Sequence, residues 1–170
     1  MGRLKKLIEA FDSLPDYNIE IGIPEGDNPR KKDPKASKEL TNAKILFINE
    51  NGSPLRGIPA RPVLKMTIEW AIENLLDDAR QKAVKAFIKS GFDQEALEKE
   101  FEIMADRMEQ YAREAIMVND GRFAPNAPST IAQKAKRAHA PKGYDPADYN
   151  HPLFDTGQLA KAIRAILVKK

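Results

Sequence analysis

Two runs of apolar residues at helical spacing occupy the middle of this 170-residue chain. The first run places one residue per helical turn on a single face, at Ile68, Ile72, Leu75, Ala79, Ala83 and Phe87. The second keeps a 4-3-4-3-4 spacing, at Leu97, Phe101, Met104, Met108, Tyr111 and Ala115. Ser90-Gly91 ends the first run, and Asp93 is a suitable cap for the second. The sequence therefore predicts a long antiparallel helical hairpin over about 63–118.

Shorter elements are predicted on both sides of this hairpin. Apolar and other residues alternate strictly from Tyr17 to Ile23, which indicates a half-buried strand. A closing strand is expected at 165–168. Helices are expected at 4–11, 39–49 and 129–138 and directly after Thr156, and Ser129 and Thr156 are the expected caps of the last two.

No internal repeat or clear linker divides the sequence. We therefore predict one α+β domain over 1–170, in which a small antiparallel sheet packs with helices beside the hairpin. Its C-terminal part, 121–170, is expected to be rich in loops and basic.

Composition excludes several classes of protein. There are no cysteines, which removes disulfides, thiolate chemistry and cysteine-based zinc sites. No apolar run approaches the roughly 18 residues that a membrane span needs. The basic N-terminus is not expected to be a signal peptide, since Glu9 and Asp12 interrupt the apolar stretch behind it.

Charge is unevenly distributed along the chain. Nine acids and three bases lie between Asp93 and Asp120, whereas nine bases and three acids lie after that segment. Complementary patches of this kind suit docking between subunits, because they steer association and fix its register. The exposed cations proposed to contact partners are Arg30, Lys31 and Lys32 in a proline-rich stretch, and Lys134, Lys136 and Arg137 on a basic helix.

Motifs for catalysis are almost absent. Asp155-Thr156-Gly157 matches the tripeptide around an aspartic-protease carboxylate, but that chemistry needs two such carboxylates and a β-rich setting. Here helical spacing follows at once, which favours a helix start. The two histidines, His139 and His151, are expected in a solvated loop or a packed turn rather than in a metal or acid–base site, and no glycine-rich phosphate loop is present. We expect no enzyme, no cofactor and no metal site.

Three stretches of the sequence carry recognisable motifs. The first contains Asn49-Glu50-Asn51-Gly52 at a helix end, followed by Ile58-Pro59-Ala60-Arg61-Pro62. The second is the Pro125-Asn126-Ala127-Pro128 turn before the basic helix. The third is Pro152-Leu153-Phe154-Asp155-Thr156-Gly157. In residues, order and spacing these stretches resemble the virion-morphogenesis family of tailed bacteriophages, whose members are also called tail-completion or neck proteins.

The resemblance implies a structural protein of the virion rather than an enzyme. Such proteins join or complete the tail at the head–tail interface as rings or collars, so the expected partners are the tail terminator, the head-side connector and further copies of the chain, with a hexameric ring as one form. The expected location is the neck or tail region of the virion, after synthesis in the host cytoplasm. Family members often continue with a further strand or hairpin, which this sequence lacks, so we expect a neighbouring subunit to complete the sheet edge.

Two alternatives remain open at this point: a tail assembly factor that is absent from the finished virion, and a small basic nucleic-acid-binding protein. Direct contact with DNA would use the basic helix. Within the motifs, Arg61 lies between two prolines and is expected to be exposed and to contact a partner. An ordinary surface arginine explains the same pattern.

Overall fold

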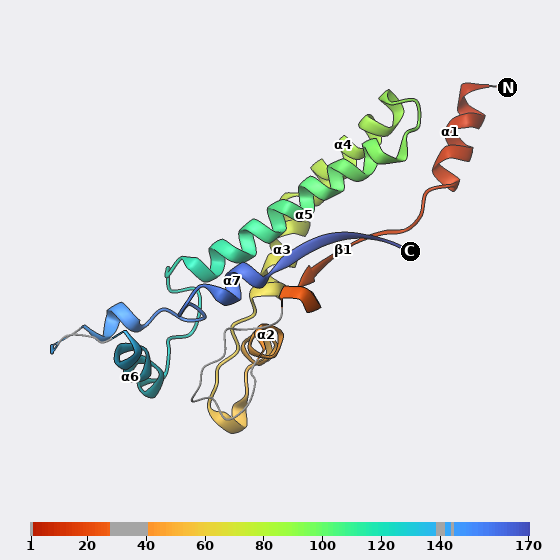
Figure 1. Ribbon diagram of the computed structural model, residues 1–170. Helices are drawn as coiled ribbons and strands as arrows, with labels where there is room; N and C mark the ends of the chain where they lie inside the picture. The colour runs from red at the N-terminus through yellow and green to blue at the C-terminus, as the bar shows by residue number, and fades with distance from the viewer. Residues whose placement is uncertain (1, 28–40, 139–141, 144) are drawn as a thin grey trace. The chain divides into compact units, whose positions relative to one another are not determined.

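The computed structural model describes residues 2–27, 41–138, 142–143 and 145–170, and Figure 1 shows their path. The helices are α1 (Arg3–Asp12), α2 (Asn42–Asn51), α3 (Val63–Asn74), α4 (Leu76–Lys89), α5 (Gln94–Met117), α6 (Pro128–Arg137) and α7 (Gln158–Ala162). The strands are β1 (Tyr17–Gly22) and β2 (Arg164–Lys169), and short 3-10 turns cover Glu25–Asp27, Pro54–Arg56 and Pro146–Tyr149. The fold is therefore mixed, with helices and a small antiparallel sheet.

Contacts between residues divide the chain into two compact units. The first unit contains Met1–Gly22, Met66–Gln110 and Arg164–Lys170, and the second contains Ile23–Lys65 and Tyr111–Ile163. Neither unit is one continuous segment. The single domain expected over 1–170 stays a prediction.

The sheet of the first unit joins the two predicted strands. β1 and β2 pair antiparallel in a register that sets Tyr17 opposite Lys169 and Ile21 opposite Ala165. Side chains alternate between the two faces of a strand, so Ile19, Ile21 and Ala165 share one face, and that face packs on the helices. Both strand predictions are confirmed, although β1 ends one residue earlier than expected, at Gly22, and β2 is one residue longer at each end.

The predicted hairpin is present in part. α4 and α5 pack along their apolar seams, with Ala83, Phe87 and Leu97 in one buried cluster, and they lie side by side in Figure 1. Asp93 caps α5 as expected, since its carboxylate accepts a hydrogen bond from the Glu95 N–H at 3.1 Å.

The prediction of one continuous helix before the turn is wrong, because two helices, α3 and α4, meet at Leu75. The backbone of Leu75 leaves helical geometry, with φ −121° and ψ −33°. Beside it, the Asn74 side chain donates to the Trp70 carbonyl at 2.8 Å. The apolar spacing runs through this point without interruption, so the pattern gave no sign of the break.

A buried carboxylate ties the sheet of the first unit to α5. Glu98 is 8% exposed. It accepts hydrogen bonds from the Tyr17 hydroxyl at 2.9 Å and from Gln94 at 2.7 Å, and it pairs with Lys169 at 2.7 Å. Burial alone would raise the pKa of Glu98, but the hydrogen bonds from Lys169, Gln94 and Tyr17 outweigh it and the pKa is lowered. One ionised group thus holds both strands and a helix.

No helix among the described residues combines the length and the apolar character that crossing a membrane requires.

Candidate partner-binding cavity

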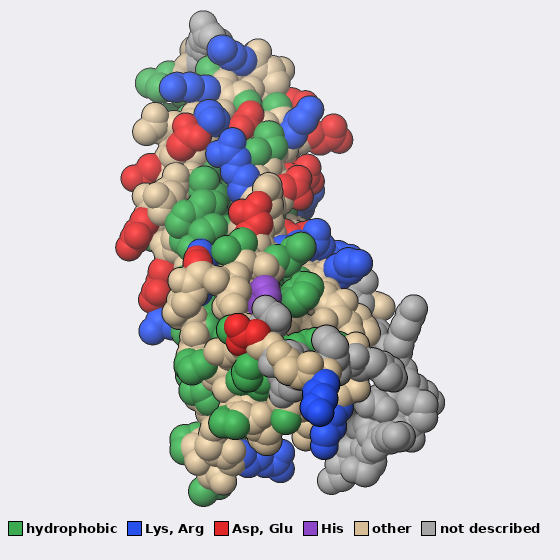
Figure 2. Space-filling model, turned by 90° about the vertical axis from the view of Figure 1, so that its left-hand side faces the viewer, with side chains coloured by type: hydrophobic (Ala, Val, Ile, Leu, Met, Phe, Trp, Pro, Cys, Tyr) green, Lys and Arg blue, Asp and Glu red, His purple; other side chains and the backbone are tan. Residues whose placement is uncertain are grey.

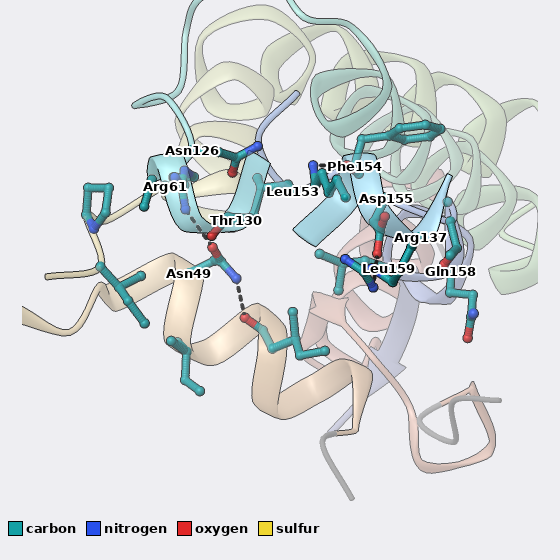
Figure 3. Close-up of a pocket in the computed structure, with 18 of the residues that line it drawn as sticks. Asn49, Arg61, Asn126, Thr130, Arg137, Leu153, Phe154, Asp155, Gln158 and Leu159 are labelled. Atoms are coloured by element: carbon teal, nitrogen blue, oxygen red, sulfur yellow. Dashed lines mark hydrogen bonds and ion pairs between the residues drawn. The ribbon is translucent and has the colours of Figure 1, made fainter. Parts of the chain in front are cut away.

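The second unit contains a cavity of about 380 Å3. Its walls come from four places: α2, the 57–61 segment, the start and face of α6, and the 153–159 segment. Figure 3 shows side chains from these segments around the hollow. All three motif stretches that carry the family resemblance contribute to it. Residues far apart in the sequence are therefore neighbours here.

Arg61 holds one side of the cavity together. Its Nε donates to the Ala124 carbonyl at 2.8 Å, one terminal nitrogen donates to the Asn49 side-chain oxygen at 3.1 Å, and the other donates to the Pro125 carbonyl at 2.9 Å. The arginine is only 6% exposed, and burial lowers its pKa. Figure 3 shows Arg61 pointing toward Asn49. The expectation of an exposed Arg61 is wrong, because these acceptors draw the guanidinium inward.

The Asn49-Glu50-Asn51-Gly52 motif is explained by local geometry. Asn49 accepts from Arg61 and donates to the Ile45 carbonyl at 2.8 Å. The Glu50 carboxylate accepts from the backbone N–H groups of Leu64 and Lys65 at 2.9 and 2.8 Å, so it caps the first turn of α3.

Gly52 ends α2 where no other residue fits. Its φ is +70°, and a Cβ there would lie 2.8 Å from the Ala60 nitrogen and 2.9 Å from the Ile58 oxygen. Both neighbours are backbone atoms, which cannot rotate away. The motif therefore fixes how the end of α2 meets the 58–60 segment.

The proline-rich turn before α6 supplies the Pro125 carbonyl that binds Arg61 and the Asn126 side chain that lines the cavity. Asn126 donates its backbone N–H to the Asn150 side-chain oxygen at 2.8 Å. Pro128 is the first residue of α6, and Ala127 stands at the cap position without a side-chain bond. The prediction that Ser129 caps this helix is wrong, because proline already suits the first turn and the helix begins one residue earlier.

Lys134 connects α6 to the third motif stretch. Its half-buried ammonium donates to the His151 and Phe154 carbonyls at 2.6 and 2.5 Å. Burial lowers the pKa of Lys134, which the charge of Asp155 partly offsets. Lys134 therefore binds α6 to the segment that contains His151 and Phe154, and it is also a candidate for contact with a partner.

Asp155 forms an ion pair with Arg137 at 2.8 Å, and Figure 3 shows the two side chains turned toward each other. The prediction that Thr156 caps α7 is wrong, because Gly157 occupies the cap position in the left-handed region with φ +71°. The short helix itself is confirmed. Lys136 is exposed on α6.

Other predicted residues have simpler settings. Pro59 lines the cavity, and Pro62 stands directly before α3. His151 stacks on Phe154 with ring centroids 4.8 Å apart and has a ring nitrogen 3.0 Å from the Ile116 carbonyl. Burial lowers the pKa of His151, so its neutral form is favoured at pH 7. Arg30, Lys31, Lys32 and His139 lie outside the described residues.

The charge of the cavity is its main chemical property. Arg61, Lys134 and Arg137 line it with one acid, Asp155, which leaves two positive charges in excess. Arg61 and Lys134 donate to amide and carbonyl oxygens, all of them neutral. Isoleucine and leucine side chains complete the wall. Such a site suits a carboxylate that lies beside an aliphatic group.

Sequence reasoning missed Asn150, which anchors the proline-rich turn from the opposite segment. A single asparagine in a polar stretch gives no periodic signal.

Within the described residues, no group of three or more possible metal ligands is brought together. Comparison of the chain with protein-family models, with curated proteins and with solved structures found no match.

Proposed function

We propose that the chain is a non-enzymatic structural subunit of a tailed bacteriophage, of the neck or tail-completion type. It completes or joins the tail at the head–tail interface by assembling into a ring-like oligomer. Its partners are further copies of itself, the tail terminator and the head-side connector, and its place is the neck or tail of the virion.

The observation that carries this proposal is the bonding among the motif stretches. Arg61 of the first stretch binds Asn49 of the same stretch and the Pro125 carbonyl of the second, as well as the Ala124 carbonyl just before it. Lys134, just after the second, binds the carbonyl of Phe154 in the third. Residues that resemble one family thus depend on one another physically, which three unrelated short matches would not require. This supports treating the three as a single signature.

Exposed apolar side chains support an assembled state. Leu4 is 69% exposed, Ile72 56%, Ile8 52% and Ile166 51%. Figure 2 shows patches of hydrophobic side chains between charged ones on one face. Exposed apolar groups that gather in patches are typical of surfaces that bind partners. We infer that α3, α4 and α5 serve in the assembly as one long hairpin.

The bonding of Asp155 supports a non-enzymatic role. Its carboxylate pairs with Arg137 rather than with a second acid, whereas protease chemistry needs two carboxylates that share a proton. Proteolysis that is present in the native protein and lost in Asp155→Asn would contradict this part of the proposal.

Two measurements test the proposal. Light scattering across concentration should give a closed oligomer of defined mass, either alone or after addition of a tail or connector protein. Mass spectrometry of purified virions should find the chain in the particle. Its absence from virions whose tails fail without it would favour an assembly factor, and salt-sensitive binding to plain duplex DNA would favour a nucleic-acid-binding protein.

A further inference from the structure

The lining of the cavity in the second unit fits a ligand with two properties. Arg61 and Lys134 are hydrogen-bonded to neutral oxygens, so the cavity keeps an excess of two positive charges. Carboxylates would balance this charge. Its aliphatic wall, which includes Ile45, Ile58 and Leu153, calls for an apolar side chain next to them. Charges held away from water bind an opposite charge more strongly than exposed ones do.

Four helices of the first unit, α1, α3, α4 and α5, expose large apolar side chains that could fill this role, and their charges differ. On α1, exposed Leu4 and Ile8 lie beside Lys5, which has the same sign as the cavity. On α5, exposed Ile103 lies one turn from Lys99 and one turn from Arg107. The acids around Ile103 exceed these two bases by only one. On α4, exposed Val84 and Ile88 lie beside Lys85 and Lys89, which again have the sign of the cavity. None of these three segments therefore has the strong negative charge that would complement a positive cavity.

The exposed side of α3 has the matching chemistry. Ile68 is 42% exposed and Ile72 is 56% exposed, and residues four apart lie on the same side of a helix. From Ile68 to Asp77 the sequence contains three acids, Glu69, Glu73 and Asp77, and no base. All three are exposed. We call this segment, 68–77, the acidic ridge.

We propose that the acidic ridge of one copy docks into the positive cavity of a second copy. The two isoleucines contact the aliphatic wall, and the carboxylates offset the excess charge of Arg61, Lys134 and Arg137. This inference rests on the proposed function, because it names the surfaces through which the ring-like oligomer forms.

The geometry of such a contact is head to tail. Ridge and cavity are different surfaces, so each copy offers one of each and the contact is heterologous. Contacts of this type close into rings when the rotation between copies permits, and otherwise continue as filaments. A two-fold dimer does not follow from it. The proposed contact therefore agrees with a ring and disagrees with a strict dimer.

Cross-linking in the full chain tests the contact directly. The chain has no cysteines, so introduced cysteines are unique. Ile72→Cys on the ridge, mixed with a differently tagged Ala127→Cys at the exposed edge of the cavity, should form a mixed disulfide under mild oxidation. The matched control replaces Ile72→Cys with Ile103→Cys, which should give little product. Equal yields from both mixtures would overturn the proposal.

Charge reversal gives an independent measurement. Glu73→Lys combined with Asp77→Lys should weaken self-association about tenfold, a loss that a few like-charge contacts readily produce. The control, Glu95→Lys combined with Glu102→Lys on exposed positions of α5, makes the same change in net charge and should alter the dissociation constant less than about twofold. Analytical ultracentrifugation measures both.

The outcomes separate this inference from the proposed function. An oligomer that tolerates the ridge variant as well as the control overturns the ridge contact and leaves the neck role standing. A disulfide that forms only within one chain of an Ile72→Cys/Ala127→Cys double variant, and never between copies, also overturns it. Absence of the chain from virions contradicts the virion role, whatever the cross-linking shows.

Discussion

Arg61→Ala should destabilise the second unit strongly. The substitution removes three hydrogen bonds from a charged donor, each worth roughly 1.5–3 kcal/mol before its acceptor finds another partner. Pro125 is exposed, so water can replace the arginine at its carbonyl, whereas Asn49 and Ala124 are partly buried. Two poorly solvated acceptors at roughly 1–3 kcal/mol each give a loss of about 3 kcal/mol in the free energy of unfolding.

Thermal unfolding followed by circular dichroism measures this loss. For a chain of this length about 3 kcal/mol corresponds to roughly 6–12 °C in Tm. The single tryptophan, Trp70, lies in the first unit, so its fluorescence reports the other part of the chain. A Tm that falls by circular dichroism before Trp70 fluorescence changes would place the damage in the second unit.

A matched control comes from the same connection between α2 and α3. Arg56 is exposed at the end of a 3-10 turn, and Arg56→Ala should change stability by less than about 0.5 kcal/mol. Arg61→Lys should fall between the wild type and Arg61→Ala, since an ammonium keeps the charge but cannot reach three spread acceptors. If Arg61→Ala unfolds within about 1 °C of the wild type, the three hydrogen bonds of Arg61 do not hold the second unit together.

Three other perturbations have defined outcomes. The pKa of Glu98 is lower in the folded than in the unfolded chain, so its contribution to stability is complete above the unfolded pKa of about 4.3. That contribution is lost as the pH falls through the folded pKa. Glu98→Gln should therefore remove this part of acid unfolding, which urea melts at a series of pH values measure. Burial and Glu98 raise the pKa of Tyr17 to about 12, so the stability from its O–H is complete below about pH 10 and is lost toward pH 12. Tyr17→Phe should abolish this loss of stability at alkaline pH. A variant with the same pH profile as the wild type would contradict the hydrogen bond to Glu98. Gly52→Ala should lower Tm through strain and a clash with Ala60, whereas Gly26→Ala, which meets nothing within 4 Å, should not.

Much of the first unit could be predicted because its signals are local. Period-two alternation located β1, and the seams located α4 and α5, since each pattern describes which side of an element is buried. The break at Leu75 was not predicted because the apolar spacing continues through it. Periodicity reports burial, not the continuity of the backbone.

The cavity could be predicted only in its components. The resemblance drew attention to the right stretches, but nothing in the sequence says that they meet. Two of the three acceptors of Arg61 lie 63 and 64 residues further along the chain, so the neighbouring prolines suggested an exposed side chain where the fold buries it. The Ser129 and Thr156 caps failed for a different reason: Pro128 and Gly157 fix the helix starts by backbone conformation, which side-chain preference alone does not reveal.

Burial of Arg61 changes how an assembly experiment must be interpreted. An Arg61→Ala chain that fails to enter particles would have been taken as the loss of a partner contact, had the side chain been exposed. With three internal acceptors, the same failure follows from an unfolded second unit. Glu73 and Asp77 are exposed, and within the part of the chain that the structure describes neither forms such a bond, so their reversal changes a surface charge and leaves the interior intact. Variants of the acidic ridge, rather than variants of Arg61, can therefore separate an effect on assembly from an effect on folding.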